Sequence, residues 1–137
     1  MAKIRVLLAD DHSLFRKGIA RILNKQPDFE VVGEASDGLE VVVKALELLP
    51  DLILMDVNMP GCDGLEATRW IKRELPDVII VMLTVRDEDD KLLPAIRSGA
   101  QGYLSKDMKS WDLIDLLRRT SVMCMYKGHH SQLATVQ

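Results

Sequence analysis

The sequence lacks cysteine motifs, long hydrophobic runs and an excess of positive charge, and each absence excludes a class of protein. Cys62 and Cys124 show neither metal-ligand spacing nor a disulfide framework, which is typical of a reducing compartment. No apolar run approaches the roughly 20 residues that span a bilayer, and acids follow the N-terminus too closely for a signal peptide. A net charge of -3 provides no basic surface for nucleic acid. We therefore expect a cytoplasmic protein that neither enters a membrane nor binds nucleic acid directly.

The length and composition favour one folded domain. The chain has 137 residues, enough for one well-buried core and too few for two ordinary domains. Hydrophobic residues make up 47% and charged residues 28%, which is typical of a globular chain rather than a disordered one. Residues 123–137 show no clear hydrophobic periodicity. We expect a domain over residues 1–122, followed by a C-terminal tail or linker remnant over residues 123–137.

The stretch 51–64 combines an apolar run with an acid that needs a partner. Four apolar residues, Leu52 to Met55, lead directly into Asp56 and then into a loop with one proline and two glycines. An uninterrupted apolar run of this length indicates a strand that is covered on both faces. An ionised group at the end of such a strand is costly to bury without compensation. We therefore predict that Asp56 is a nucleophile and a metal ligand.

The alternation of apolar patterns predicts five strands and five helices. Short runs of leucine and β-branched residues indicate strands, and apolar residues at helical spacing indicate helices that end near Pro27, Pro50 and Pro76. The expected strands span residues 3–9, 29–35, 52–55, 78–83 and 102–105. This order predicts an α/β fold, a doubly wound five-stranded parallel sheet of the flavodoxin-like (βα)5 type with strand order 2-1-3-4-5.

Three details of the helices depend on single residues. Ser13 is a candidate N-cap for the first helix. Pro94 falls inside the fourth helical pattern, so we expect that helix to be short or irregular, or to start late with Pro94 in its first turn. Trp111 and Val122 fall at the spacing of the apolar face of the last helix.

Polar residues follow four of the five predicted strands. Asp10 and Asp11 follow the first strand, Asp56 the third, Thr84 the fourth and Lys106 the fifth. In doubly wound sheets, ligands bind outside the carboxyl ends of the strands, near the point where the strand order reverses. We therefore expect these side chains to meet at one edge of the sheet.

The residue types at that edge are suited to phosphoryl transfer. Three converging carboxylates repel one another unless their pKa values rise or a cation neutralises them. Mg2+ fits, because it prefers oxygen ligands and takes one or two carboxylates together with a phosphate, whereas zinc is disfavoured without histidine or cysteine spacing. Lys106 and Thr84 would hold phosphoryl oxygens, which supplies positioning and charge stabilisation. Asp56 would then form an aspartyl phosphate.

Four motifs in this order resemble the receiver domain of bacterial two-component response regulators, which is CheY-like. They are Asp10-Asp11, the segment from Asp56 to Gly64, Leu83-Thr84 and the segment from Gly102 to Lys106. Each motif is weak alone, but their order and spacing on the predicted strand ends are specific. The resemblance covers about residues 3–120, and the run DDHSLFRKGI is similar to the LuxR/NarL-type subgroup with a C-terminal helix-turn-helix.

The resemblance implies a phosphoacceptor and a set of metal ligands. In the family pattern, the position of Asp56 accepts the phosphate, and the positions of Asp11 and Asp56 bind Mg2+ directly. The backbone carbonyl of Asn58 would be a further ligand, and Asp10 would act through water.

The resemblance also implies a switch and its partners. Thr84 and Tyr103 would form a switch pair that reshapes the surface of the fourth helix, fifth strand and fifth helix after phosphorylation. A sensor histidine kinase would donate the phosphate, and a homodimer would form through that surface or through the first and fifth helices. The output would be transcription through a DNA-binding domain. The chain would be no enzyme, apart from removing phosphate from its own aspartate.

Two departures from the family pattern and two other functions stay open. Asp107 stands where many receivers carry a proline, so the Lys106-Asp107 peptide could be cis or trans. Too few residues follow the last helix to form the subgroup's DNA-binding domain. A Mg2+-dependent phosphatase of the haloacid-dehalogenase type would require a D-x-D pattern, which Asp10-Asp11-His12 lacks. The other alternative is an interaction module that is never phosphorylated. Separately, we expect His12, beside the acids, to be solvated or a local hydrogen-bonding group.

Overall fold

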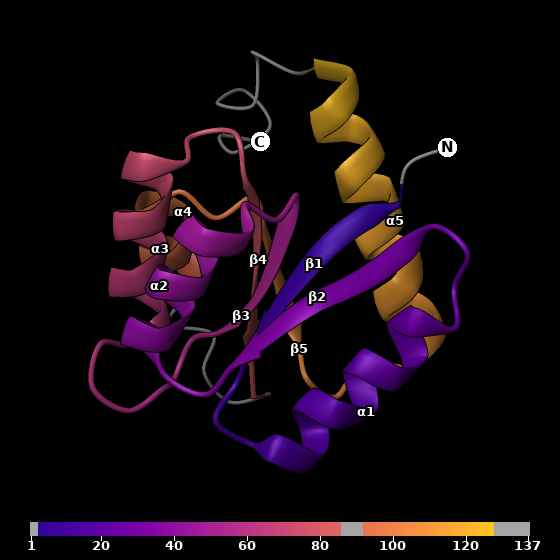
Figure 1. Ribbon diagram of the computed structural model, residues 1–137, viewed down its shortest axis with the longest axis horizontal. Helices are drawn as coiled ribbons and strands as arrows, with labels where there is room; N and C mark the ends of the chain where they lie inside the picture. The colour runs from indigo at the N-terminus through magenta and orange to yellow at the C-terminus, as the bar shows by residue number, and fades with distance from the viewer. Residues whose placement is uncertain (1–2, 86–91, 128–137) are drawn as a thin grey trace.

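The computed structural model describes residues 3–85 and 92–127, with side chains described as far as residue 122. Strands and helices alternate along the chain as the sequence patterns predict (Figure 1). The strands are β1 (Ile4–Ala9), β2 (Phe29–Ala35), β3 (Leu52–Asp56), β4 (Ile79–Thr84) and β5 (Gly102–Ser105). The helices are α1 (Ser13–Asn24), α2 (Gly38–Leu48), α3 (Gly64–Glu74), α4 (Leu92–Ser98) and α5 (Ser110–Lys127).

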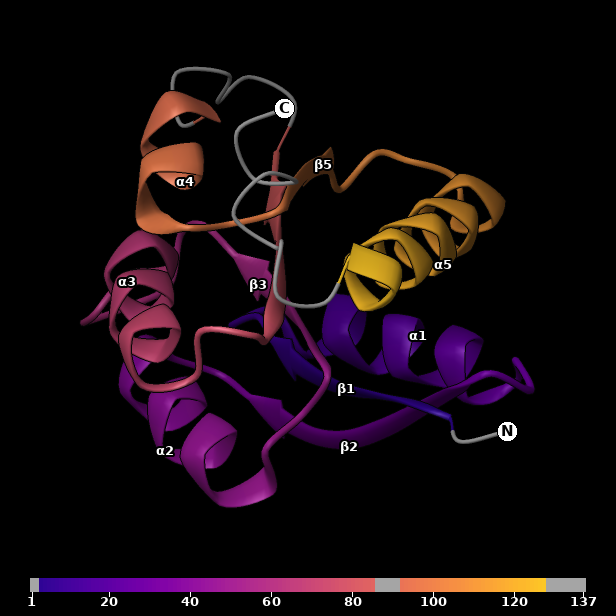
Figure 2. The same cartoon turned by 90° about the horizontal axis from the view of Figure 1, so that it is seen from above.

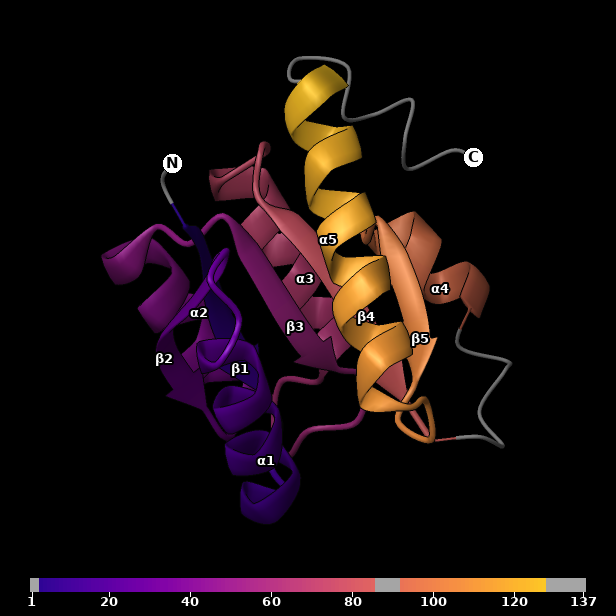
Figure 3. The ribbon, with the colours of Figure 1, turned by 90° about the vertical axis from the view of Figure 1, so that its right-hand side faces the viewer.

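The five strands form one parallel sheet in the order β2-β1-β3-β4-β5, which confirms the predicted topology. Helices α2, α3 and α4 cover one face of the sheet, and α1 and α5 cover the other (Figure 2). Figure 3 looks onto the face that carries α1 and α5. Because all strands are parallel, their carboxyl ends lie at the same edge of the sheet, where the polar residues were predicted to meet.

Strand β3 contributes to both cores of the molecule. Its five residues are all buried, and successive side chains point to opposite faces of the sheet. Ile53 and Met55 belong to the core beneath α2, α3 and α4, whereas Leu52 and Leu54 belong to the core beneath α1 and α5. This double burial explains the uninterrupted apolar run, because neither face of β3 is left for polar side chains.

The predicted N-cap of α1 is wrong by one residue. His12 is the N-cap, Ser13 is the first helical residue, and the cap makes no side-chain hydrogen bond. The reason lies upstream, because the main-chain N–H of His12 donates to Asp10 Oδ1 at 2.9 Å and the chain turns there. In α3, by contrast, Asp63 Oδ1 accepts from the N–H of Glu66 at 2.9 Å, a regular side-chain cap.

The last helix differs from the prediction in its face and in its length. Leu113, Ile114 and Leu117 are buried, but Trp111 is 77% exposed and Val122 is 61% exposed. The buried stripe follows the inward face, and Trp111 lies outside it at the start of the helix. Helix α5 continues to residue 127, so the first five residues of the predicted tail are helical. Neither proline nor glycine interrupts residues 110–127, so nothing in the backbone ends the helix earlier.

Helix α4 is short, as Pro94 predicts. It spans seven residues, and Pro94 is the third, within the first turn, where a missing N–H removes no helical hydrogen bond. The part of the fourth helical pattern over residues 86–91 lies outside the described residues. Gly99 follows the helix with a positive φ of 109°, which is the glycine C-cap geometry.

Candidate functional site: acids and a lysine at the carboxyl edge of the sheet

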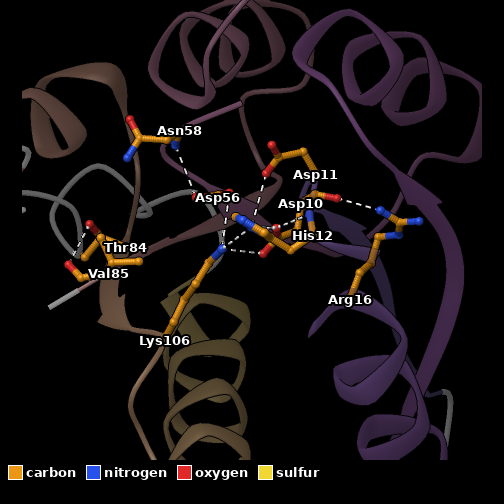
Figure 4. Close-up of polar contacts among 9 residues, drawn as sticks. All are labelled: Asp10, Asp11, His12, Arg16, Asp56, Asn58, Thr84, Val85 and Lys106. Atoms are coloured by element: carbon orange, nitrogen blue, oxygen red, sulfur yellow. Dashed lines mark hydrogen bonds and ion pairs between the residues drawn. The ribbon is translucent and has the colours of Figure 1, made fainter. Parts of the chain in front are cut away.

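Three strands deliver charged side chains to one place. Asp56 is the last residue of β3, Asp10 follows β1 directly, and Lys106 follows β5 directly. Asp10 and Asp56 are each 3% exposed, although they are acids. Figure 4 shows the ammonium group of Lys106 pointing at both carboxylates. The predicted meeting of these residues at the sheet edge is confirmed.

Lys106 is shared by two buried carboxylates. Its Nζ lies 2.8 Å from Asp10 Oδ2 and 3.2 Å from Asp56 Oδ2. Two negative charges thus face one positive charge in a poorly hydrated place. Burial and the charge of Asp10 raise the pKa of Asp56 to about 6, although Lys106 acts in the opposite direction. Burial alone would lower the pKa of Lys106, but Asp10 and Asp56 together raise it.

Asp11 and His12 complete the acidic side of the site. His12 Nδ1 lies 3.2 Å from Asp10 Oδ1 and 3.3 Å from Asp11 Oδ1, and 3.4 Å from Lys106 Nζ. The imidazole is 67% exposed, so it lies on the solvent side of the buried Asp10. The prediction that His12 is a local hydrogen-bonding group is confirmed.

The residues present fit a hard divalent cation. Asp10, Asp11, His12 and Asp56 offer ligand atoms that all lie within 4.8 Å of one another. The buried Oδ2 of Asp10 has a charged contact with Lys106 but no hydrogen-bond donor in good geometry. The buried carboxylate of Asp10, which shares one lysine with Asp56 and lies beside Asp11, provides the oxygen-rich surroundings that Mg2+ prefers. Asp10, Asp11 and Asp56 are therefore the residues that would hold it.

Asn58 lies beside the predicted phosphoacceptor. Its main-chain N–H donates to Asp56 Oδ1 at 3.1 Å, which orients the carboxylate from the loop side. The side chain of Asn58 is exposed. The role of its backbone carbonyl as a metal ligand stays a prediction.

Two glycines allow the loop after β3 to close tightly. A Cβ on Gly64 would lie 2.1 Å from the carbonyl oxygen of Asp56, and one on Gly38 would lie 1.8 Å from that of Cys62. The N–H of Gly64 also donates to Val57 O at 2.9 Å. The sequence pattern pointed to Gly64 as a loop residue, but it gave no sign of Gly38, which approaches this loop from α2.

The predicted switch residues lie on neighbouring strands. Thr84 is 3% exposed and its hydroxyl donates to Val85 O at 3.2 Å (Figure 4). Tyr103 is half-buried and packs against the core beneath α2, α3 and α4. Their role as a switch pair stays a prediction.

Two further features of the site concern its lysine and its helix α1. Every peptide bond of the described residues is trans, including Lys106-Asp107. Lys106 is held by its main-chain N–H, which donates to Thr84 O at 2.7 Å, and its Nζ lies 4.9 Å from the centre of the Phe15 ring.

Arg16 donates to the carbonyl oxygen of Asp10 at 2.6 Å, a contact that sequence reasoning missed. Its presence in the DDHSLFRKGI motif was the available signal.

A doubly wound parallel sheet with clustered acids and a lysine at the carboxyl ends of its strands defines the class of α/β domains that bind ligands at that edge. Comparison with known proteins gives the family within this class. Residues 6–118 match the model of the response regulator receiver domain. The chain therefore belongs to the response regulator receiver domain family.

The relatives specify the kind of response regulator. The chain is 53% identical over 118 residues to the transcriptional regulatory protein LiaR of Bacillus subtilis, covering 86% of this chain and 56% of LiaR. It is 46% identical to the response regulator protein VraR of Staphylococcus aureus, with the same coverage of both chains, 86% and 56%. The chain thus spans about half the length of these curated relatives.

A solved structure agrees with the sequence relatives. A two-component response regulator of the LuxR family from Aurantimonas sp. SI85-9A1 superimposes with a TM-score of 0.83 at 31% identity, covering 88% of this chain and 86% of that one. Similarity to the LuxR/NarL-type response regulators, predicted from the motifs, is therefore confirmed. No helix among the described residues is long and apolar enough to cross a membrane.

Proposed function

We propose that this receiver is a phosphorylation-dependent switch whose phosphoacceptor is Asp56. The observation that carries the proposal is the position of its carboxylate, which ends β3, is 3% exposed and lies 3.2 Å from Lys106 Nζ. The ammonium of Lys106 is positioned to offset part of the negative charge that a phosphoryl group on Asp56 would bring. Mg2+, held by Asp10, Asp11 and Asp56, would supply the remaining positive charge.

The chain's own residues act on the reacting groups in distinct ways. In its ionised form, one carboxylate oxygen of Asp56 attacks the phosphorus of the donor, and the bond from phosphorus to the donor's leaving group breaks. Lys106 offsets the negative charge of Asp10 Oδ2 and Asp56 Oδ2, which both lie near its ammonium group. The main-chain N–H of Asn58 donates to Asp56 Oδ1 and holds that oxygen in place. The hydroxyl of Thr84 would leave Val85 O and donate to the new phosphoryl group.

Movement of Thr84 would change the conformation of the surface formed by α4, β5 and α5. Leu92, Leu93 and Ile96 on α4 are all exposed apolar residues, and Trp111 is exposed at the start of α5. We propose that Tyr103 turns inward as Thr84 moves, which changes this surface for an output partner or for a second copy of the chain. A homodimer through α1 and α5 is the alternative arrangement.

Membership of the receiver domain family supports the proposed kinase partner. A sensor histidine kinase would donate the phosphate in the cytoplasm, and the output would be transcription through a DNA-binding domain outside the receiver domain proposed for residues 1–122. The chain itself would bind no nucleic acid. It would accept one phosphate on its own aspartate without turning over a substrate, apart from its own dephosphorylation.

Phosphodonor labelling tests the proposal. Incubation with Mg2+ and acetyl phosphate should add one phosphoryl group that hydroxylamine removes, as measured by intact-protein mass spectrometry. Asp56→Asn should abolish the addition, and Asp28→Asn, which changes an acid at the opposite edge of the sheet, should leave it intact. An unmodified wild-type protein, or a label that persists in Asp56→Asn, would refute the assignment. Continuous hydrolysis of phosphate esters would favour a phosphatase instead.

A further inference from the structure

Arg16 connects the acidic loop to the edge strand β2. The side chain is only 13% exposed, although it belongs to an outer helix. Its Nε donates to Glu34 Oε1 on β2 at 2.7 Å, and its Nη1 donates to the main-chain carbonyl oxygen of Asp10 at 2.6 Å. Figure 4 shows the guanidinium reaching Asp10 from the side opposite Lys106.

The carbonyl that Arg16 binds belongs to the peptide between the two adjacent acids. Asp10 lies just beyond the end of β1, and its N–H donates to Ala35 O of β2 at 3.0 Å. Both main-chain polar groups of Asp10 are therefore held by groups anchored on β2. The Asp10-Asp11 peptide cannot rotate without breaking the bond to Arg16, so the directions of both carboxylates depend on it.

An arginine suits this position better than a lysine. The planar guanidinium presents Nε and Nη1 in a fixed relation, so one side chain reaches Glu34 and the Asp10 carbonyl together. Lys17 also approaches Glu34 Oε1, at 3.8 Å, but its side chain is 67% exposed. The main-chain carbonyl of Glu34 accepts a hydrogen bond from Lys44 of α2, which anchors the glutamate further.

We infer that Arg16 is a positioning residue, which holds the Asp10-Asp11 peptide so that the two carboxylates together bind a divalent cation. In this role Arg16 would act through the Asp10 carbonyl, without contacting the cation or the phosphoryl group. The inference rests on the proposed function, because Arg16 would support the metal site of the proposed switch. Partners that orient metal ligands in this way contribute on the order of tenfold or more to metal affinity.

Calorimetric titration of the full chain with Mg2+, without phosphodonor, tests the inference. Arg16→Gln should weaken Mg2+ binding on the order of tenfold, and Arg16→Lys should fall between this variant and the wild type. Glu34→Gln should weaken binding less, because the bond to the Asp10 carbonyl remains. The double variant should bind no more weakly than Arg16→Gln alone, since both residues act through one contact.

Arg118 provides the matched control. It pairs with Asp28, before β2, with Nε at 2.6 Å from Oδ2 and Nη2 at 2.9 Å from Oδ1. Arg118→Gln removes a comparable arginine pair at the opposite edge of the sheet, so its Mg2+ affinity should equal that of the wild type. At saturating Mg2+, phosphorylation of Asp56 in Arg16→Gln should approach the wild-type rate.

The possible outcomes separate the two proposals. Unchanged Mg2+ affinity in Arg16→Gln, with a loss of stability like that of Arg118→Gln, would overturn the inference and leave the proposed function standing. If Arg16→Gln fails to fold by circular dichroism, Arg16→Lys and Glu34→Gln decide in the same way. A wild-type protein that binds Mg2+ but accepts no phosphate would refute the proposed function alone, and one that binds no Mg2+ would refute both.

Discussion

Basic and acidic side chains meet at both ends of the parallel strands, but their charges balance at the amino edge and not at the carboxyl edge. At the amino edge, Arg118 pairs with Asp28, one base with one acid, and both side chains remain about a third exposed. At the carboxyl edge, Lys106 faces both Asp10 and Asp56, and all three side chains are nearly buried. The Arg118–Asp28 pair is balanced in charge and partly exposed to solvent, so it adds little beyond local stability. The carboxyl edge holds surplus negative charge, which a cation or a redistribution of protons must balance.

The largest expected effect comes from removing the shared base. Lys106→Met leaves two buried carboxylates without compensation, so the free energy of unfolding at neutral pH should fall by about 3 kcal/mol. Urea unfolding in EDTA measures this, with the exposed Lys109→Met as the control. If both variants lose the same stability, Lys106 does not offset unfavourable negative charge at the carboxyl edge, and the proposed difference between the two edges is wrong.

The next effect concerns the pH dependence of Asp56. Its pKa is raised from 3.8 to about 6 in the folded state by burial and by Asp10. The folded protein therefore binds the proton more tightly than the unfolded chain, so stability should fall as the pH rises from about 4 through 6. Above that range the ionised carboxylate costs roughly 2–3 kcal/mol.

Asp56→Asn removes this cost, so it should be more stable than the wild type at pH 7 and similar to it near pH 4. Urea midpoints measured without Mg2+ across this range provide the test. Mg2+ should narrow the difference at pH 7. A constant difference at all pH values would show that Asp56 does not titrate as described.

A smaller effect tests the tight loop at the carboxyl edge. A Cβ on Gly64 would lie 2.1 Å from Asp56 O, whereas one on Gly18 would meet nothing within 4 Å. Gly64→Ala should lower the free energy of unfolding by about 1–3 kcal/mol and slow phosphorylation by displacing Asp56. Gly18→Ala, in an exposed turn of α1, should instead stabilise by roughly 0.5–1 kcal/mol. Thermal unfolding and phosphodonor labelling of both variants provide the test. Equal stability and equal labelling rates in the two variants would contradict the prediction.

The smallest effect is expected at the amino edge. The hydrogen bond from Arg118 lowers the pKa of Asp28 below its ordinary value of 3.8, so the stabilisation is present above that pH and lost as the pH falls further. Because the pair is partly exposed, Arg118→Gln should cost less than about 1 kcal/mol, and salt should reduce the cost. A double-mutant cycle with Asp28→Asn measures it. A coupling energy between Arg118 and Asp28 as large as the stability loss expected for Lys106→Met would remove the distinction between the two edges.

Local patterns predicted the strand ends well, because parallel topology brings every carboxyl end to one edge. Asp10, Asp56 and Lys106 were placed together from strand order alone. The features that were missed depend on contacts between distant segments. Arg16 binds a main-chain carbonyl and a glutamate 18 residues away, and Gly38 meets a loop that begins beyond the next strand.

The errors in the helices have a related cause. A sequence pattern gives the spacing of apolar residues, but the orientation of a helix is set by the sheet it covers. Trp111 fits the spacing of α5 and is nevertheless exposed, because Leu113, Ile114 and Leu117 provide the face that contacts the sheet. The N-cap of α1 was likewise decided by the carboxylate of Asp10, which binds the N–H of His12.

The alternating burial of β3 restricts how the sequence can change in length. The N–H of Asp51 donates to Arg5 O before the strand, and the N–H of Val57 donates to Leu83 O after it, so both ends are pinned to neighbouring strands. Inserting one residue directly after Asp51 would move Leu52 and Leu54 to the face of Ile53 and Met55, and would turn Asp56 to the opposite face of the strand. Substitutions that preserve volume are tolerable in β3, but its residue count is set by the acid at its end.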